Sequence, residues 1–327
     1  MMATRRQCLA WLGTLTTVPG AFAQTPSPTW PTKPVRMIVA YPPGGVSDVV
    51  ARALAERLAV RLGVPVVVEN RAGASGTIGV NAVAKSAPDG YALVFSAITP
   101  LTLNPHLGKS PFDPFKDIAP VARVMYSPVL ILATAAAHET DFKSLLATAR
   151  AKPATVRWST SGPASLGHVM LEQIRLAARV DITHVPYKGA GPQINDALGA
   201  QFEVLSVNAS AAVLQHVRAG KLRPLAVGAP ARLESLPGVP TLDELGYPAA
   251  NLSSHFGILA PAGTPGSVLE RLNLEINSAL ALPALRELLL VGECVPAPTS
   301  RAEFVRQISS EFESMGRIIR AAHITVE

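Results

Sequence analysis

Short runs of almost purely apolar residues alternate along this chain with longer segments in which apolar residues recur at helical spacing. Nine of these runs have the length and composition of strands: 35–41, 65–70, 91–97, 128–136, 155–161, 182–189, 202–208, 223–229 and 255–263. Strands that are apolar on both faces and alternate with helices are typical of a parallel sheet with helices packed on both sides. The pattern therefore predicts an α/β fold.

The segment that follows the first run shows the helical pattern most clearly. Its apolar residues recur every four positions, at Val50, Leu54, Leu58 and Leu62. Ser47 is the expected N-cap of this helix, and Gly63 is its expected end. Asp48 lies in the first turn, where the helix dipole favours a carboxylate. We interpret Asp48 as a helix-stabilising residue, with ligand contact as the alternative.

Two boundaries divide the chain into two predicted domains. The first lies near Ser127, after three strands and their helices, and the second lies near Asn251. The run at 255–263 follows the second boundary and is placed to return the chain to the first domain. Two further helices are predicted at 266–280 and 302–321, after a loop that contains two prolines.

The first 23 residues have the pattern of an export signal. Arg5 and Arg6 are followed by an uncharged stretch and by Ala21–Ala23, which offers a small-x-small cleavage site. The apolar stretch is too short to span a bilayer stably, so a retained anchor is the weaker alternative. The arginine pair is also typical of the twin-arginine export route. Cys8 has no lipobox before it, and we expect a soluble periplasmic protein rather than a lipoprotein.

Composition and charge narrow the range of functions. The 327 residues are 48% hydrophobic and 16% charged, and the formal net charge of +6 falls by two, to +4, without Arg5 and Arg6. The basic residues are scattered, which argues against nucleic-acid binding. Cys294 is then the single cysteine, so no internal disulfide can form, and its apolar neighbours indicate a small buried residue. No histidines and cysteines have the spacing of a zinc site, and no metal is expected.

A rigid corner joins the first strand to the first helix, where residues 42–45 read Pro-Pro-Gly-Gly. A helix N-terminus exposes unpaired N–H groups and a partial positive charge, and glycines let an oxygen-bearing ligand approach them. The N–H groups of Gly44, Gly45, Val46 and Ser47 are therefore candidates for holding an anion. A tight turn without a ligand is the alternative, and this stretch alone leaves both interpretations open.

Glycines also recur at Gly73, Gly76 and Gly79, but their spacing does not match a nucleotide-binding fingerprint. Ser75 stands where a dinucleotide-binding loop requires its second glycine, and no acidic residue closes a following strand at the expected distance. The chain has no Walker A sequence either. We expect no nucleotide and no other cofactor.

Two later corners repeat the succession of a strand, a glycine turn and a helix. In the first of them, Ser159, Thr160 and Ser161 end the strand, and Ser165 opens the helix. The second corner lies within 185–198. Both corners carry glycines and hydroxyls but few charges, a composition that favours binding of a small polar anion by hydrogen bonds rather than by salt bridges.

An exported serine hydrolase is the alternative function. Ser161 or Ser165 would be the nucleophile and His168 or His184 the base, with Asp196 nearby in the sequence. The G-x-S-x-G elbow of the α/β-hydrolases is absent, however, and His184 is better explained as a buried core residue. We therefore do not expect an enzyme.

Several motifs, taken in order, resemble one known family. They are YPPGG-x-S-D at 41–48, NR-x-G-x-x-G-x-x-G at 70–79, PDGY at 88–91, NPHLG at 104–108, HVPYKGAGP at 184–192, LPGVPTLDELG at 236–246 and GILAPAGTP at 257–265. Together they are similar to the Bug family, the TctC-type extracytoplasmic solute receptors of tripartite tricarboxylate transporters. The resemblance covers nearly all of the chain after the export signal.

The resemblance implies a type II periplasmic binding protein, with two α/β domains joined by two crossover segments and a ligand cleft between them. Carried over to this chain, domain 1 comprises 30–126 and 251–327, and domain 2 comprises 127–250. The family implies capture of a small carboxylate and its delivery to the membrane subunits of a transporter or to a sensor receptor. We expect the receptor to be a monomer.

The same resemblance implies which residues contact the ligand. In domain 1, one carboxylate is expected to be held by Gly45, Val46 and Ser47, with further walls at Tyr41, Ser96 and Thr99. In domain 2, the expected contacts are Thr160, Ser161, Ser165, His168, Tyr187 and Asn208, with the turn at 188–189 beside them.

Two departures from the family pattern bear on the ligand. Many relatives have a loop rich in hydrogen-bond donors where this chain reads GPASLG at 162–167. Many also have an acidic residue where Val207 precedes Asn208 here, so a ligand ammonium group would lack a partner. We therefore expect a plain carboxylate with an apolar or aromatic body rather than an amino acid, and a di- or tricarboxylate stays open.

Overall fold

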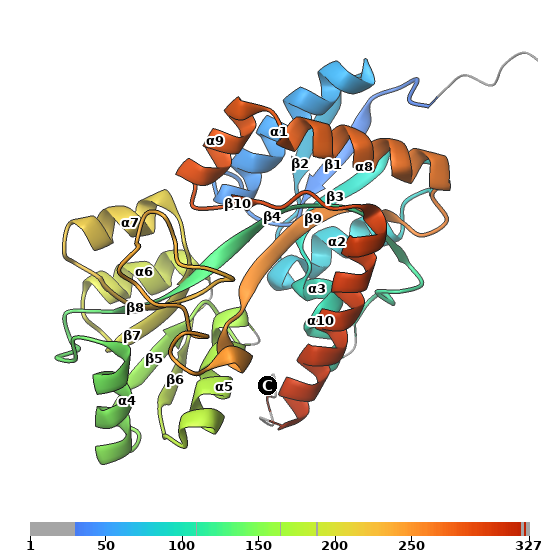
Figure 1. Cartoon of the computed structure of the whole chain (residues 1–327). Coiled ribbons are helices and arrows are strands. Elements are labelled where there is room, and N and C mark those ends of the chain that lie inside the picture. The colour runs from blue at the N-terminus through green and yellow to red at the C-terminus, as the bar shows by residue number, and fades with distance from the viewer. Residues whose placement is uncertain (1–29, 109, 164, 188, 322–323, 325–327) are drawn as a thin grey trace, which may run out of the picture.

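The computed structural model describes residues 30–321 except 109, 164 and 188, together with residue 324. The predicted export signal at 1–23 and Lys188 of the predicted 188–189 turn lie outside the described residues. Figure 1 shows two lobes joined by two long strands that pass from one lobe to the other. Each lobe consists of a sheet with helices packed against it.

The first lobe is built around three parallel strands. Its N-terminal elements are β1 (Val35–Val39), α1 (Val46–Leu62), β2 (Val66–Asn70), α2 (Thr77–Ala84), β3 (Ala92–Ala97) and α3 (Thr99–Thr102). The apolar side of α1 packs against β1 and β3, because Val50, Leu54, Leu58 and Leu62 all lie in the buried core with Met37. The four-residue spacing in the sequence therefore predicted the buried face of this helix correctly.

The second lobe repeats the succession of strands and helices. Its elements are α4 (Phe142–Ala151), β5 (Arg157–Thr160), α5 (Leu166–Ala178), β6 (Thr183–Pro186), α6 (Ala190–Leu198), β7 (Val204–Asn208), α7 (Ala211–Arg218) and β8 (Arg223–Gly228). Strands β5, β6 and β7 run parallel to one another. Trp158 on β5 is completely buried in the core of this lobe.

The two crossover strands are β4 (Ile118–Ala133) and β9 (Ser253–Pro261), and they run antiparallel to each other. Strand β4 pairs with β9 from Ile118 to Pro128 and with β7 and β8 from Val129 to Ala133. The predicted boundaries at Ser127 and Asn251 lie close to this change of partners, and they stay a prediction. The expectation of a parallel sheet is wrong for the two crossover strands. Strand β9 runs antiparallel to β3 in the first lobe, and β4 runs antiparallel to β7 and β8 in the second.

The last elements that the structure describes are α8 (Gly266–Leu280), α9 (Pro283–Val291), β10 (Val295–Pro296) and α10 (Arg301–Ala321). Helix α10 runs from the first lobe toward α5 of the second (Figure 1). Its Phe304 lies in the core of the first lobe, whereas its Met315 and Ile319 belong to the core cluster of the second. Helix α10 therefore contacts both lobes, in addition to the two crossover strands.

The start of α1 differs from the prediction. Gly45, not Ser47, is the N-cap. The Asp48 carboxylate accepts hydrogen bonds from the Gly44 N–H at 2.9 Å, from Arg52 Nε at 3.0 Å and from Asn70 Nδ2 at 2.9 Å. The Arg52 hydrogen bond is the main reason that the pKa of Asp48 falls from 3.8 to about 2. These contacts agree with the interpretation of Asp48 as a helix-stabilising residue.

Asp48→Asn is expected to lower the free energy of unfolding at pH 7 by about 1–2 kcal/mol, since the exposed Arg52 partner is screened by solvent. A carboxyl with a depressed pKa stabilises the fold above its unfolded value of 3.8, and this contribution is lost as the pH falls toward about 2. Urea unfolding at pH 7 and at about pH 3 measures the change. The exposed substitution Glu56→Gln is the control, and an Asp48→Asn penalty that is equal at both pH values would contradict the account.

Candidate ligand-binding cleft

A cleft of about 820 Å³ lies between the two lobes. The first lobe contributes residues 40–42, the loop 72–76, Ala97 and Thr99. The second lobe contributes segments 161–167, 187–192 and 206–208 among its described residues, and the crossover strands contribute Val129, Ser254 and Phe256. The site is therefore assembled from both lobes and from both connections.

Three helices begin at this cleft. The N-cap residues of α2, α5 and α6 are Gly76, Ser165 and Gly189, and each of them lines the cleft. The N-terminal N–H groups of a helix lack intrahelical partners, and the helix dipole adds a partial positive charge at that end. Three such ends around one space create a site that favours an anion.

The described lining residues carry no ionisable acid, lysine, arginine or histidine. The cleft is lined instead by glycines, hydroxyl residues, Asn208 and apolar side chains. An anion bound here would be held by N–H and O–H donors rather than by a charged side chain. Such a site can bind and orient an oxygen-bearing ligand.

Six of the twelve residues predicted to contact the ligand line the cleft: Tyr41, Thr99, Ser161, Ser165, Tyr187 and Asn208. Ser96 and Thr160 are completely buried behind it. His168 is also buried and lies outside the lining. Gly45, Val46 and Ser47 are absent from the lining among the described residues, so the first predicted corner reaches the cleft only at its start, at Pro42.

The loop at 73–76 takes the place that the prediction gave to the corner at 44–47. Gly73 and Gly76 have positive φ angles of 132° and 96°, and Ala74 and Ser75 also lie in the left-handed region. A Cβ on Gly76 would come within 3.1 Å of Tyr41 Oη and 3.2 Å of Ser96 Oγ, so a side chain has little room there. The glycines at 73, 76 and 79 are the sequence signal for this loop, although their spacing does not identify what it binds.

The Tyr41 hydroxyl is a polar group in the first-lobe wall of the cleft. It accepts a hydrogen bond from the Ala97 N–H at 3.3 Å, which leaves its own proton available. Burial raises the pKa of the Tyr41 phenol, so it stays a neutral donor. Behind it, the completely buried Ser96 hydroxyl interacts with the Tyr41 hydroxyl and partly offsets the rise in the pKa of Tyr41.

The histidines of the second lobe serve its packing. The rings of His168 and His184 are stacked, with centroids 3.9 Å apart and planes 12° from parallel. Burial, followed by the neighbouring His168, lowers the pKa of His184 to about 4. Its Nε2 lies 2.8 Å from the Thr160 hydroxyl, which is completely buried. His184 is thus neutral and hydrogen-bonded, but it is only partly buried on β6, so the prediction of a buried core histidine is wrong.

This arrangement gives no support to the serine-hydrolase alternative. The Ser165 hydroxyl caps α5 by accepting a hydrogen bond from the backbone N–H of His168 at 3.3 Å. Among the described residues, the Thr160 hydroxyl lies 2.8 Å from Nε2 of His184, and solvent does not reach it. A buried threonine is a poor candidate for a nucleophile that must meet a substrate.

Tyr187 and Asn208 are tied into the structure of the second lobe. The Tyr187 hydroxyl donates a hydrogen bond to Asp196 at 2.7 Å, and burial raises the pKa of Tyr187 to about 12. Asn208 Nδ2 lies 3.1 Å from Ser127 Oγ on β4 and 2.9 Å from Ser254 Oγ on β9. Asn208 therefore links β7 to both crossover strands where they pass the cleft.

Three further observations concern metal binding, membrane-spanning helices and the remaining cysteine. In the described part of the chain, no group of three or more histidine, cysteine, aspartate or glutamate residues is arranged to hold a metal ion. The helices of that same part include none with the length and hydropathy needed to cross a bilayer. Cys294 is completely buried, and burial raises the pKa of its thiol to about 12, as its apolar sequence neighbours indicated.

Comparison with known proteins agrees with this geometry. BugT of Bordetella pertussis is 36% identical over 314 residues, which cover 95% of this chain and 96% of BugT. A UPF0065 protein of Bordetella bronchiseptica is 34% identical over 94% of this chain and 90% of its own length. Both relatives match along almost the whole chain.

Solved structures show the same similarity. A structure described as a periplasmic transporter has a TM-score of 0.81 and 33% identity, covering 91% of this chain and 100% of that one. Rpa4515 of R. palustris, solved with adipate, has a TM-score of 0.81 and 30% identity over 90% of this chain and 99% of its own. The model of the tripartite tricarboxylate transporter family receptor, TctC, matches residues 50–324. The chain therefore belongs to the TctC family of tripartite tricarboxylate transporter receptors, and it has the two-domain fold of periplasmic binding proteins.

Proposed function

We propose that this protein is an exported periplasmic receptor that captures one small carboxylate between its lobes and delivers it to a tripartite tricarboxylate-type carrier. The lobes in this proposal are the predicted domains, 30–126 with 251–327 and 127–250, in a monomer. They rotate about β4 and β9 to close over the ligand. The acid is bound and released without chemical change.

The observation that carries the proposal is the convergence of three helix N-termini on a cleft without charged side chains. A carboxylate fits such a site because it accepts several hydrogen bonds and interacts favourably with the positive ends of helix dipoles. Two related proteins support this ligand class, since Rpa4515 was solved with adipate and MatC of Rhodopseudomonas palustris with malate. MatC is 26% identical to this chain, with a TM-score of 0.77.

The lining also favours one kind of acid. No cationic side chain among the described lining residues is available to neutralise a second carboxylate, and no acidic one to pair with an ammonium group. Apolar surface comes from Tyr41, Val207 and Phe256. The ligand proposed here is therefore an acid with one ionised carboxylate and an uncharged, partly apolar body.

A thermal-shift screen of the purified protein tests this function. Acids of one charge with aliphatic and aromatic bodies are compared with di- and tricarboxylates and with amino acids at equal ionic strength. We expect a monocarboxylate to raise the melting temperature most, because a ligand that binds only the folded state stabilises it by mass action. If no acid of any class stabilises the protein, the receptor proposal is wrong; if only dicarboxylates or amino acids do, the proposed ligand class is wrong.

A further inference from the structure

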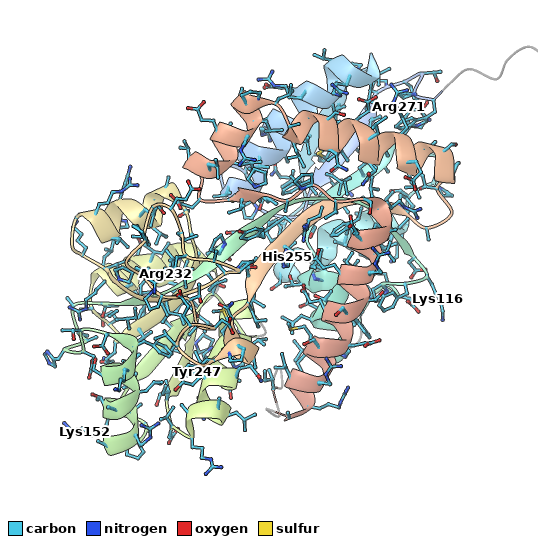
Figure 2. All side chains as sticks on the ribbon, in the orientation of Figure 1. Lys116, Lys152, Arg232, Tyr247, His255 and Arg271 are labelled. Carbon is cyan, nitrogen blue, oxygen red and sulfur yellow. The ribbon has the colours of Figure 1, made fainter. Side chains whose placement is uncertain are left out.

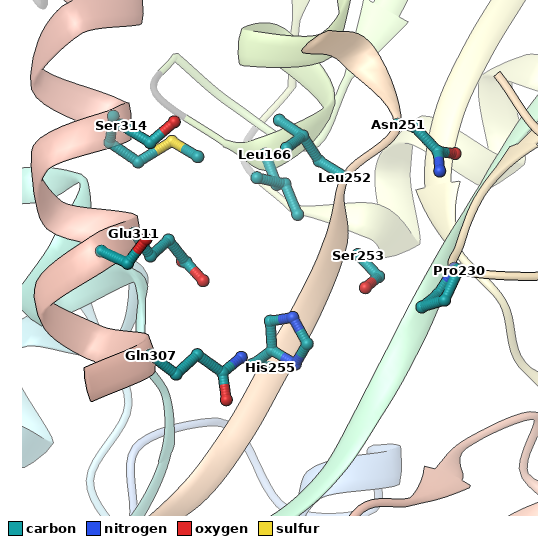
Figure 3. Close-up of a pocket in the computed structure, with 11 residues that line it drawn as sticks. Leu166, Pro230, Asn251, Leu252, Ser253, His255, Gln307, Glu311 and Ser314 are labelled. Atoms are coloured by element: carbon teal, nitrogen blue, oxygen red, sulfur yellow. The ribbon is translucent and has the colours of Figure 1, made fainter. Parts of the chain in front are cut away.

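A second cavity, of about 350 Å³, lies on the other face of β9 from the ligand cleft. Its polar lining residues are Asn251, Ser253, His255, Gln307, Ser310, Glu311 and Ser314. Figure 3 shows Gln307 and Glu311 reaching from α10 toward β9, with Ser253 and His255 facing them. Figure 2 places His255 at the waist between the two lobes.

The alternation of side chains along β9 separates the two cavities. Ser254 and Phe256 line the ligand cleft, whereas Ser253 and His255 line the second cavity. Successive side chains of a strand point to opposite faces, so this crossover strand has one cavity on each side. Leu166, at the start of α5, lines both cavities. The second cavity is thus bounded by the connection between the lobes and by both lobes themselves.

Glu311 is an acidic group in this cavity, and it has no cationic partner in the part of the chain that the structure describes. Its Oε1 accepts a hydrogen bond from the Thr102 hydroxyl at 2.9 Å, and among the described residues it forms no ion pair within 4.0 Å. Arg123 is the nearby cation, but it is engaged with Ala297 O and with Gln307 Oε1, both at 2.9 Å. Burial raises the pKa of Glu311 to about 7. A buried carboxylate is stable in its charged form only when it is paired.

The ring of His255 forms another part of the cavity wall. Its Nδ1 is buried and has no hydrogen-bond partner among the described residues. Burial, followed by the charge of Arg123, lowers the pKa of His255 to about 4, so the ring is neutral and one of its nitrogens accepts. The cavity therefore combines a carboxylate, the neutral ring of His255 and three serine hydroxyls that can donate or accept.

We propose that this cavity is a second binding site, and that it takes a small primary ammonium compound whose N–H groups donate to Glu311 and to the serine hydroxyls beside it, next to the ring of His255. A cationic ammonium group supplies the charge that Glu311 lacks and up to three donors. The hydroxyls of Ser253, Ser310 and Ser314 suit a short polar arm on the same molecule. At about 350 Å³, the cavity lies within the usual size range of small-molecule sites.

Binding of the ammonium compound in this cavity is coupled to binding of the carboxylate in the ligand cleft. Rotation of the lobes about β4 and β9 changes the separation of α10, β9 and Leu166, which are the walls that hold the ammonium compound. Its binding energy therefore differs between the open and closed forms, and it shifts the equilibrium between them. By thermodynamic reciprocity, the carboxylate changes the affinity for the ammonium compound by the same factor, about fivefold or more.

Calorimetric titration of ethanolammonium chloride into the purified protein tests the site, with sodium chloride at equal ionic strength as the blank. We expect saturable binding at one site without any carboxylate present, so this result does not depend on the proposed function. Glu311→Gln keeps the size of the side chain and removes the charge, and it is expected to weaken binding about tenfold or more. The exposed Glu313→Gln on the same helix is expected to bind as the wild type does.

A second measurement, on the wild type, tests the site if the Glu311→Gln variant folds poorly. In NMR spectra of the wild type, the imidazole resonances of His255 are expected to shift as ethanolammonium is added. The shifts are expected to follow the same saturation curve as the heat of binding. Absence of saturable binding, undisturbed His255 resonances, or equal affinity in a folded Glu311→Gln variant would overturn the site. Equal ethanolammonium affinity with and without a saturating carboxylate would overturn the coupling.

Discussion

Asn208→Leu is expected to weaken carboxylate binding by about tenfold or more. The substitution removes the hydrogen bonds that link β7 to Ser127 on β4 and to Ser254 on β9, and it leaves those two hydroxyls without this partner. An unsatisfied polar group of this kind costs about 1–3 kcal/mol. It also removes the single amide side chain among the described lining residues of the cleft. Isothermal titration with the acid selected by the thermal-shift screen measures the loss.

The matched control for this variant is Asn195→Leu. Asn195 is exposed on α6 and does not line the cleft, so its replacement by the same residue is expected to leave the affinity unchanged. Circular dichroism and urea unfolding establish that both variants are folded. Wild-type affinity in a folded Asn208→Leu protein would show that this link between the lobes does not contribute to binding.

Gly228→Ala is expected to lower the free energy of unfolding by about 3 kcal/mol. A Cβ at this position would lie 2.2 Å from the carbonyl oxygen of Leu252 and 2.7 Å from Met170 Cε. The backbone oxygen cannot move aside as a flexible side chain can, so β8 and the segment that leads into β9 must separate. Urea unfolding followed by circular dichroism gives the change in stability.

Gly238→Ala is the control for this effect. Gly238 has open space around the position of a Cβ and no positive φ angle, so alanine is expected to be tolerated there. Equal stabilities of the two alanine variants would contradict the close approach of β8 to Leu252. A loss confined to Gly228→Ala would support the geometry at the start of the second crossover.

Much of the fold could be predicted from hydrophobic spacing. The helix predicted at 266–280 has the bounds of α8, and α10 begins one residue before the predicted 302. The run at 128–136 overlaps only the second half of β4, which begins at Ile118. Pro120 and Arg123 interrupt the apolar run in the first half of β4, so the sequence shows no clear strand pattern there. Pairing with β9 overrides this local weakness through a long antiparallel ladder.

The second-lobe part of the cleft was easier to predict than the first-lobe part. Ser161, Ser165 and Tyr187 follow or open elements whose ends meet at one edge of the sheet, and the structure brings them together. In the first lobe, the loops after β1 and β2 both end in glycines at the same edge. The sequence does not say which loop turns toward the cleft, and tertiary packing places 72–76 there instead of 44–47.

The second cavity could not be predicted from sequence. Glu311 and His255 lie 56 positions apart, and they meet only because α10 packs across the back of β9. The assignment of Ser253 and His255 to one face and of Ser254 and Phe256 to the other requires the position of the strand between the lobes. A single-residue shift of β9 would exchange the two faces.

A crystal structure of the protein with the acid that stabilises it most is the most direct test of the central claim. We expect one carboxylate to lie between the lobes, with its oxygens within hydrogen-bond distance of N–H groups at the starts of α5 and α6 and of donors on the first lobe. A carboxylate that lies outside this cleft, or that faces solvent while the rest of the ligand occupies it, would contradict the account.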